Sequence, residues 1–165
     1  MKAKMFRALL PIAILFTMVS CSSDTNEAPS QENRLVTTYD YNDTELRLVT
    51  IINDYRASIG LNTLAVINHI SYKSQEHNLY MIDNNVISHD LFQQRATNLM
   101  EVLGADRVAE NLAYNYQTPE SAMNAWLNSP GHKANIVGDF TPLGISITVD
   151  QTTGKKYYTN MFIKK

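Results

Sequence analysis

The chain contains a single cysteine, Cys21, and this limits how the rest of the chain can hold a fold together. The cysteine closely follows an apolar segment, residues 8–19, and three basic residues lie within the first seven positions. A basic start followed by a short apolar run is typical of a secretory signal peptide. With one cysteine, no disulfide can form within the chain, so a folded body has to be stabilised by its hydrophobic core.

Residues 18–20, immediately before Cys21, resemble a lipobox, in which the cysteine is acylated and becomes the first mature residue. We therefore predict a lipoprotein signal peptide over residues 1–20, with lipidation at Cys21. This places the protein outside the cytoplasm, anchored by lipid to a membrane of the bacterial cell envelope, in the periplasm or on the cell surface. The alternative is ordinary signal cleavage beside a free thiol. Residues 21–41 are polar without hydrophobic periodicity, so they predict a flexible tether.

The composition excludes one class of partner. Hydrophobic residues make up 44% and charged residues 18%, as in a soluble globular domain. Loss of residues 1–20 would remove three of the 14 basic residues and none of the 16 acidic ones, leaving 11 basic residues. A mildly acidic surface without a basic run argues against nucleic acid as a partner.

Residues beyond 41 carry helix signals first and strand signals last. Asn42 and Glu45 have the spacing of a capping box, and Gly60 supplies a helix end. Residues 144–149 alternate in polarity, and a second β-rich run at 156–163 predicts a hairpin. This order predicts an α+β domain whose sheet packs against helices. Helices are expected over residues 42–59, 68–82, 91–103 and from residue 118, and the buried face of the first helix is expected to be Leu46, Val49, Ile52, Tyr55 and Ile59.

Three short segments place polar residues where packing does not require them. They are residues 87–90, 108–112 and 129–136, which contain His89, Glu110 and His132 respectively. Two imidazoles and a carboxylate brought together by the fold would form a divalent-metal site or an acid–base pair. Isolated histidines are more often structural, so the residues alone leave both interpretations open.

Other polar residues have simpler interpretations. His77 is expected to be a buried structural residue, and His69 is expected to lie on the surface. Arg95 either orients an acid or caps a helix. Asn111 and Asn135 either line a site or bond the local backbone. Trp126 is expected to lie in the core.

The three segments, taken in order, resemble the signature segments of the CAP superfamily (SCP/PR-1-like, named for cysteine-rich secretory proteins, antigen 5 and pathogenesis-related 1). The segment from Trp126 to Ile136 is the most specific, and the similarity extends over about residues 45–163. The resemblance implies a CAP/SCP domain over residues 42–165, folded as a three-layer α-β-α sandwich with a central antiparallel sheet. It also implies a cleft that holds two histidines and two acids.

By motif, the histidines are His89 and His132 and one acid is Glu110. The second acid of many members has no counterpart here, since Gln93 and Gln94 lie near its expected place. The resemblance implies that His89, His132 and Glu110 hold Zn²⁺ or another divalent cation weakly.

The implied function is a lipid-anchored, extracytoplasmic binding module whose cleft takes a lipid, glycan or peptide. One alternative is a metal-assisted hydrolase, a peptidase or esterase of the cell envelope, for which His89, Glu110 and His132 are the catalytic candidates. Another is an adhesion or structural envelope protein with a vestigial cleft. Zinc hydrolases usually present three ligands and a separate base, as in a helical His-Glu-x-x-His pattern, and the sequence contains no such pattern. This favours binding over catalysis.

Overall fold

A computed structural model describes residues 34–165; the predicted signal peptide, Cys21 and residues 21–33 of the predicted tether lie outside the described residues. The helices are α1 (Asp43–Ser58), α2 (Asn68–Asp83), α3 (Phe92–Leu103), α4 (Pro119–Asn128) and α5 (Pro130–Ile136). The strands are β1 (Ala65–Val66), β2 (Arg107–Tyr114), β3 (Pro142–Val149) and β4 (Lys156–Lys164).

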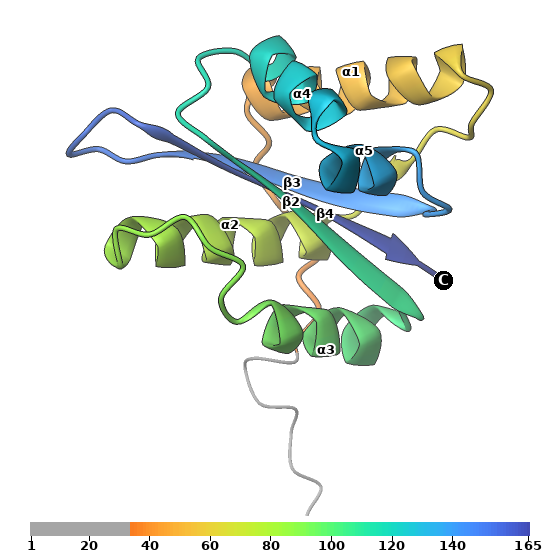
Figure 1. Cartoon of the computed structure of the whole chain (residues 1–165). Helices are drawn as coiled ribbons and strands as arrows, with labels where there is room; N and C mark the ends of the chain where they lie inside the picture. Colours follow the sequence, from red (N-terminus) through yellow and green to blue (C-terminus); the bar gives the residue numbers. More distant parts are fainter. Residues whose placement is uncertain (1–33) are drawn as a thin grey trace, which may run out of the picture.

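These elements form three layers (Figure 1). The sheet lies between α1, α4 and α5 on one face and α2 and α3 on the other, which confirms the predicted α-β-α sandwich. The strand order is β1-β3-β4-β2. The predicted β3–β4 hairpin is present and β2 is antiparallel to β4, but the short β1 pairs with β3 in parallel, so the sheet is mixed rather than wholly antiparallel.

Capping residues set the start of α1 as predicted. The Asn42 side chain accepts a hydrogen bond from the backbone N–H of Glu45, and the Glu45 carboxylate accepts one from the backbone N–H of Asn42. The predicted buried face is partly wrong, because Leu46 and Ile59 are each 47% exposed. The buried face instead includes Glu45 and Arg56, whose side chains bond to the backbone of Ile147 and residues 62, 136 and 138. The periodicity of apolar residues could not reveal these two charged residues, which are buried because the backbone supplies their hydrogen bonds.

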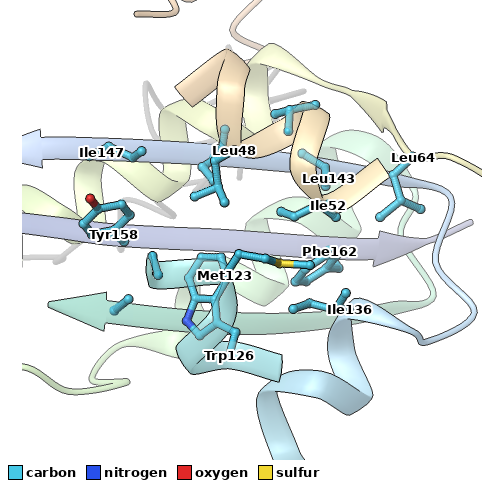
Figure 2. Packing of buried hydrophobic residues seen from close by; sticks show 14 of the residues in the cluster. Leu48, Ile52, Leu64, Met123, Trp126, Ile136, Leu143, Ile147, Tyr158 and Phe162 are labelled. Atoms are coloured by element: carbon cyan, nitrogen blue, oxygen red, sulfur yellow. The ribbon is translucent and has the colours of Figure 1, made fainter. Parts of the chain in front are cut away.

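The main hydrophobic core lies between the sheet and the layer of α1 and α4 (Figure 2). Trp126 of α4 is 1% exposed, as expected, and its Nε1–H donates to the Leu112 carbonyl at 2.7 Å. The core joins helix, strand and hairpin residues that are distant in sequence. Its largest fully buried members are Leu48, Ile52, Trp126, Ile136, Leu143, Ile145, Tyr158 and Phe162.

On the other face of the sheet, α2 and α3 cover two smaller apolar clusters, and α2 also makes a polar contact with the hairpin. Asn78 of α2 donates to the Ser146 carbonyl of β3 at 2.9 Å and accepts from the Thr159 hydroxyl of β4 at 2.7 Å. The helix approaches β3 so closely at Gly144 that a Cβ there would overlap the backbone of Ile70 and Ser71. Small and hydrogen-bonded residues therefore set the spacing of this layer.

The predicted tether and the body overlap in residues 34–41. The Val36 N–H donates to Nδ1 of His69 at 3.1 Å, and the Tyr39 hydroxyl donates to Glu45 and Ser146, at 3.0 Å each. The prediction that His69 lies on the surface is wrong, because His69 is fully buried. Its burial is possible because its second nitrogen also has a partner, Oδ1 of Asn98 at 2.8 Å. Val36 and Tyr39 of the predicted tether are thus bonded to the body.

Replacing Trp126 by Ala should lower the free energy of unfolding by about 3–5 kcal/mol, because a large ring is removed from a packed core. Equilibrium denaturation in urea measures the loss. Leu46→Ala is the matched control, since Leu46 is exposed on α1 and should change the stability by less than about 0.5 kcal/mol. A loss at Trp126 no larger than that at Leu46 would contradict the core assignment.

Replacing Gly144 by Ala should destabilise the domain by about 3 kcal/mol or more, because the added methyl group meets backbone rather than a movable side chain. Gly131→Ala is the control, since a Cβ at Gly131 meets no atom within 4 Å and its φ lies outside the left-handed region. Thermal unfolding of both variants provides the measurement. Equal melting temperatures for the two variants would mean that α2 does not press on β3.

Candidate functional site

The three residues singled out by motif come from three different parts of the fold. His89 lies in the connection between α2 and α3, Glu110 lies on β2, and His132 lies on α5. β2 is an edge strand of the sheet and contacts both α3 and α5, which belong to opposite layers. The predicted site is therefore assembled around the edge of β2.

Glu110 is buried, and both of its carboxylate oxygens are hydrogen-bonded. His89 Nδ1 lies 2.8 Å from Oε1, and Arg95 donates to Oε2 through Nε at 2.9 Å and Nη2 at 2.7 Å. Arg95 also donates through Nη1 to the Asp90 carbonyl at 2.7 Å. Arg95 therefore orients an acid, Glu110, rather than capping a helix.

These contacts fix the charge of the carboxylate. Burial raises the pKa of Glu110, but the hydrogen bond from His89 and the positive charge of Arg95 outweigh burial, and the net pKa is below its usual value. Burial lowers the pKa of Arg95, an effect that the charge of Glu110 opposes. Glu110 is therefore a fixed anion near neutral pH, and its oxygens are already occupied.

His89 is the most accessible member of the group. Its side chain is 54% exposed, although its Nδ1 is held by Glu110. In a neutral ring, donation from Nδ1–H to a carboxylate leaves Nε2 as the acceptor nitrogen. The imidazole is thus held in one orientation and presents a lone pair on Nε2.

His132 approaches from the other layer. Successive side chains of β2 point to opposite faces of the sheet, and next to Glu110 the Asn111 side chain donates to the His132 carbonyl at 3.0 Å. Asn135 donates to Asn111 Oδ1 at 2.8 Å, so the two asparagines tie α5 to β2 rather than bonding only their local backbone. Burial lowers the pKa of His132, and a positive charge on nearby His89 lowers it further.

His77 belongs to the surroundings of Glu110, which the sequence did not indicate. It is buried as expected, its Nε2 lies 2.8 Å from the Ser88 carbonyl, and the same atom lies 4.0 Å from Oε1 of Glu110. Its Nδ1 is buried without a hydrogen-bond partner. Burial and the charge of Arg95 lower the pKa of His77. Its proximity to Glu110 arises only from the packing of α2 beside β2, so spacing in the sequence carries no signal of it.

The residues fit a closed metal site poorly. Within residues 34–165, no group of three or more His, Cys, Asp or Glu side chains is arranged to hold a metal ion. Glu110 is engaged by Arg95, which leaves the imidazoles of His89 and His132 as donors. A carboxylate behind a histidine, bonded to the nitrogen that faces away from the ligand, is a common arrangement around histidines that bind metals.

A hollow of about 590 Å³ lies between α2 and α3, next to the side chains of Arg95 and His77 that approach Glu110. Its lining includes His77 and Arg95, which both approach Glu110, as well as Gln93 and Gln94, which stand near the place of the missing second acid. His89, Glu110 and His132 do not line this hollow. The hollow and the motif residues are therefore neighbouring features that share the contacts of Arg95 and His77 with Glu110.

Comparisons with known proteins agree with this architecture. The family model described as the cysteine-rich secretory protein family, CAP, matches residues 49–162. Two curated relatives are proteins of Bacillus subtilis: the uncharacterized membrane protein YlbC, 32% identical over 127 residues, and the uncharacterized protein YkwD, 30% identical over 121 residues. The alignments cover 73% and 67% of this chain but only 34% and 47% of the relatives, so the chain spans half or less of their length.

Solved structures show the same fold. An outer surface protein of Borrelia burgdorferi superposes with a TM-score of 0.69 at 23% identity, over 77% of this chain and 96% of that one. An extracellular SCP-domain protein of Bacillus anthracis superposes with a TM-score of 0.63 at 26% identity, over 78% of this chain and 45% of that one. No helix within residues 34–165 is long and apolar enough to cross a membrane. With the family model matched across most of the described residues, the layered fold present and the three motif segments gathered around β2, the chain belongs to the CAP family of cysteine-rich secretory proteins.

Proposed function

We propose that this protein is a lipid-anchored, extracytoplasmic binding module. Its binding surface is formed by the imidazoles of His89 and His132, with Glu110 and Arg95 behind them. The ligand is a lipid, glycan or peptide of the cell envelope, and the two imidazoles also hold a divalent ion weakly. Extracellular and membrane-associated relatives support the location.

We favour binding over hydrolysis because both carboxylate oxygens of Glu110 already accept hydrogen bonds. A general base works best when its pKa lies near the working pH and when an oxygen is available to take a proton. The pKa of Glu110 is lowered, and both of its oxygens accept hydrogen bonds from Arg95. Glu110 therefore acts as a support that orients His89, and a metal-assisted hydrolase would need another base.

The anchoring part of the proposal rests on Cys21 and the apolar segment before it. Two or three acyl chains hold a protein firmly at a membrane, whereas one chain binds only marginally. Between Cys21 and Val36, which is bonded to the body, lie 14 residues, which span at most about 50 Å when fully extended. The domain would thus remain close to the membrane that holds it.

Replacing Cys21 by Ser should leave the protein either soluble or with an uncleaved signal peptide. Cell fractionation followed by mass spectrometry of the intact chain distinguishes the two, and the unaltered chain should carry the mass of its acyl groups in the membrane fraction. Ser22→Ala is the control and should be lipidated normally. A Cys21→Ser variant in the membrane fraction at the mass of the cleaved chain would show that lipid is not the anchor.

Zinc binding should depend on both histidines. Calorimetric titration of the full chain, purified in detergent without a histidine tag, should show weak binding near pH 7.5 that is lost in His89→Ala and in His132→Ala. Glu110→Gln should weaken binding less, because Glu110 orients His89 without being a ligand. Protons compete for the same nitrogens, so affinity should fall as the pH drops below about 6.5.

The lowered pKa of His132 sets the direction in which the pH dependence of zinc binding should shift. His132 stays neutral to a lower pH than an ordinary histidine, so its own loss of metal affinity should begin at a more acidic pH. His69→Gln is the matched control, since His69 is buried elsewhere, and its zinc binding should equal that of the unaltered chain. Zinc binding that survives the double change at His89 and His132 would reject the two-histidine site.

A further inference from the structure

A second surface, separate from His89 and His132, runs along α2. Three hollows of about 590, 320 and 230 Å³ lie next to one another. The first and second share Lys73 and Glu76, and the second and third share Thr38 and Tyr72. The three neighbouring hollows, here together called the α2 groove, follow one another from the start of α3 to residues 34–40.

The lining of the α2 groove is balanced in charge. Three basic and three acidic residues line the three hollows, so their formal charges cancel. Both basic residues of the first hollow are paired, Lys73 Nζ at 2.8 Å from Glu76 within the hollow and Arg95 Nη2 at 2.7 Å from Glu110 behind it. An anion or a cation would have to compete with these ion pairs. The basic residues are Lys73, Arg95 and Arg34, and the acidic residues are Glu76, Glu101 and Asp40.

Most other lining residues are neutral hydrogen-bonding groups. The amides of Gln75, Gln93 and Gln94 and the hydroxyl of Thr97 each offer a donor and an acceptor. Paired donors and acceptors of this kind match the hydroxyl groups of a sugar, since each hydroxyl also donates and accepts.

Two aromatic rings are spaced along the groove. Tyr80 lines the first hollow, and Tyr72 lines the second and third. They stand eight residues apart on α2, which corresponds to about 12 Å along the helix axis. A tyrosine offers an apolar ring with a polar tip, and such a ring packs against the C–H face of a sugar. Two rings at this spacing suit a ligand of several units rather than a single one.

The inner end of the groove has two features that packing alone does not explain. His77 lines the first hollow and has a buried Nδ1 without a partner, which is an acceptor atom left unpaired. Leu91 also lines that hollow, with φ of 58° in the left-handed region that a leucine rarely adopts, and its side chain is largely exposed. Strained backbone and unpaired buried polar atoms tend to occur at ligand sites.

Other ligand classes fit less well. An extended peptide usually adds to a sheet edge or inserts side chains into apolar pockets, whereas this groove is lined by α2, α3 and residues 34–40, includes no strand and has few apolar residues. A lipid chain needs an apolar lining. A phosphate polymer needs an excess of basic residues, which the balanced lining does not provide.

We infer that the α2 groove binds an extended, uncharged polysaccharide chain. The groove takes several sugar units, with Tyr72 and Tyr80 beneath two of them and the glutamine amides bonding their hydroxyl groups. This site is distinct from the His89 and His132 surface of the proposed function and does not require metal. Residues 34–38, which form one wall, belong to the last part of the predicted tether and so would hold the groove near the polymers of the cell surface.

The test uses the full chain in a detergent without a sugar head group. The probes are hexasaccharides of β-linked glucose, α-linked glucose and β-linked N-acetylglucosamine, measured by saturation-transfer NMR and calorimetry. At least one should bind, and its monosaccharide should bind far more weakly. Tyr72→Ala and Gln94→Ala should each weaken binding about tenfold, because each removes a contact to one unit.

Two controls outside the groove separate this site from the other. Tyr116→Ala removes an exposed tyrosine outside the groove and should leave sugar binding unchanged. His132→Ala should abolish zinc binding without affecting sugar binding, and Tyr72→Ala should do the reverse. Leu91→Gly should weaken sugar binding, because it removes a lining side chain, while the relief of the left-handed backbone offsets the greater freedom of glycine in the unfolded chain and keeps the stability close to that of the unaltered chain.

Some results would overturn the inference. One is the absence of binding by all three hexasaccharides, and another is binding that Tyr72→Ala and Gln94→Ala leave unchanged. Equal affinity for an uncharged peptide of similar length, lost in the same variants, would identify a peptide groove instead. None of these results would bear on zinc binding at His89 and His132, so failure of one proposal is distinguishable from failure of the other.

Discussion

Glu110 joins the three layers of the domain through polar contacts of its buried carboxylate and of its backbone. Its side chain is held by Arg95 from α3 and by His89 from the connection after α2, and its backbone carbonyl accepts from Asn135 of α5 at 3.3 Å. An unpaired charge in such a place would cost several kcal/mol, by the usual cost of buried ions, so the position of α3 and of the His89 connection depends on this pairing. Glu45 has a similar role at the opposite edge, where it joins α1 to the backbone N–H of Ile147 in β3.

These polar connections replace what a disulfide would do in a domain of this size. The sheet is covered on one side by the main apolar core and on the other by two smaller apolar clusters and by α2, which contacts the sheet through Ser71, Asn78 and the bare backbone at Gly144. The close approach at Gly144 fixes the position of α2 on β3, because the two backbones are in direct contact there. The position of α2 in turn sets those of His77 and the α2 groove.

Much of the fold could be predicted because its signals are local. The Asn42 and Glu45 box, Thr118 before Pro119 and the glycine ends all act within one turn of a helix, so the sequence displays them directly. β2 was missed as a strand because its Glu110 and Asn111 face opposite layers, where each has a partner, so no alternation of apolar and polar residues is visible. α5 was not predicted as a separate helix because it opens with Pro130 and Gly131, although proline suits the first position of a helix.

The sequence predicted which residues form the site but not how they are arranged. Motifs selected His89, Glu110 and His132, but they carry no information on which side of β2 each side chain approaches. Arg95 was left between two roles because its contact with Glu110 depends on how α3 packs on the sheet, and His69 was misplaced because its partner Val36 lies in a segment that looked unstructured.

Arg95 and His77 connect the two surfaces that the structure presents. Both residues line the first hollow of the α2 groove, and both lie beside the carboxylate that holds His89. A change at either residue would therefore disturb both surfaces, and its effect on one could not be attributed to that surface alone. Tyr72 and His132 each belong to one surface only, which makes them the residues that can separate the two activities. If the groove and the histidines act together on one ligand, the connection has to pass through Arg95 and Glu110, because these two residues carry the contact between α3, β2 and His89.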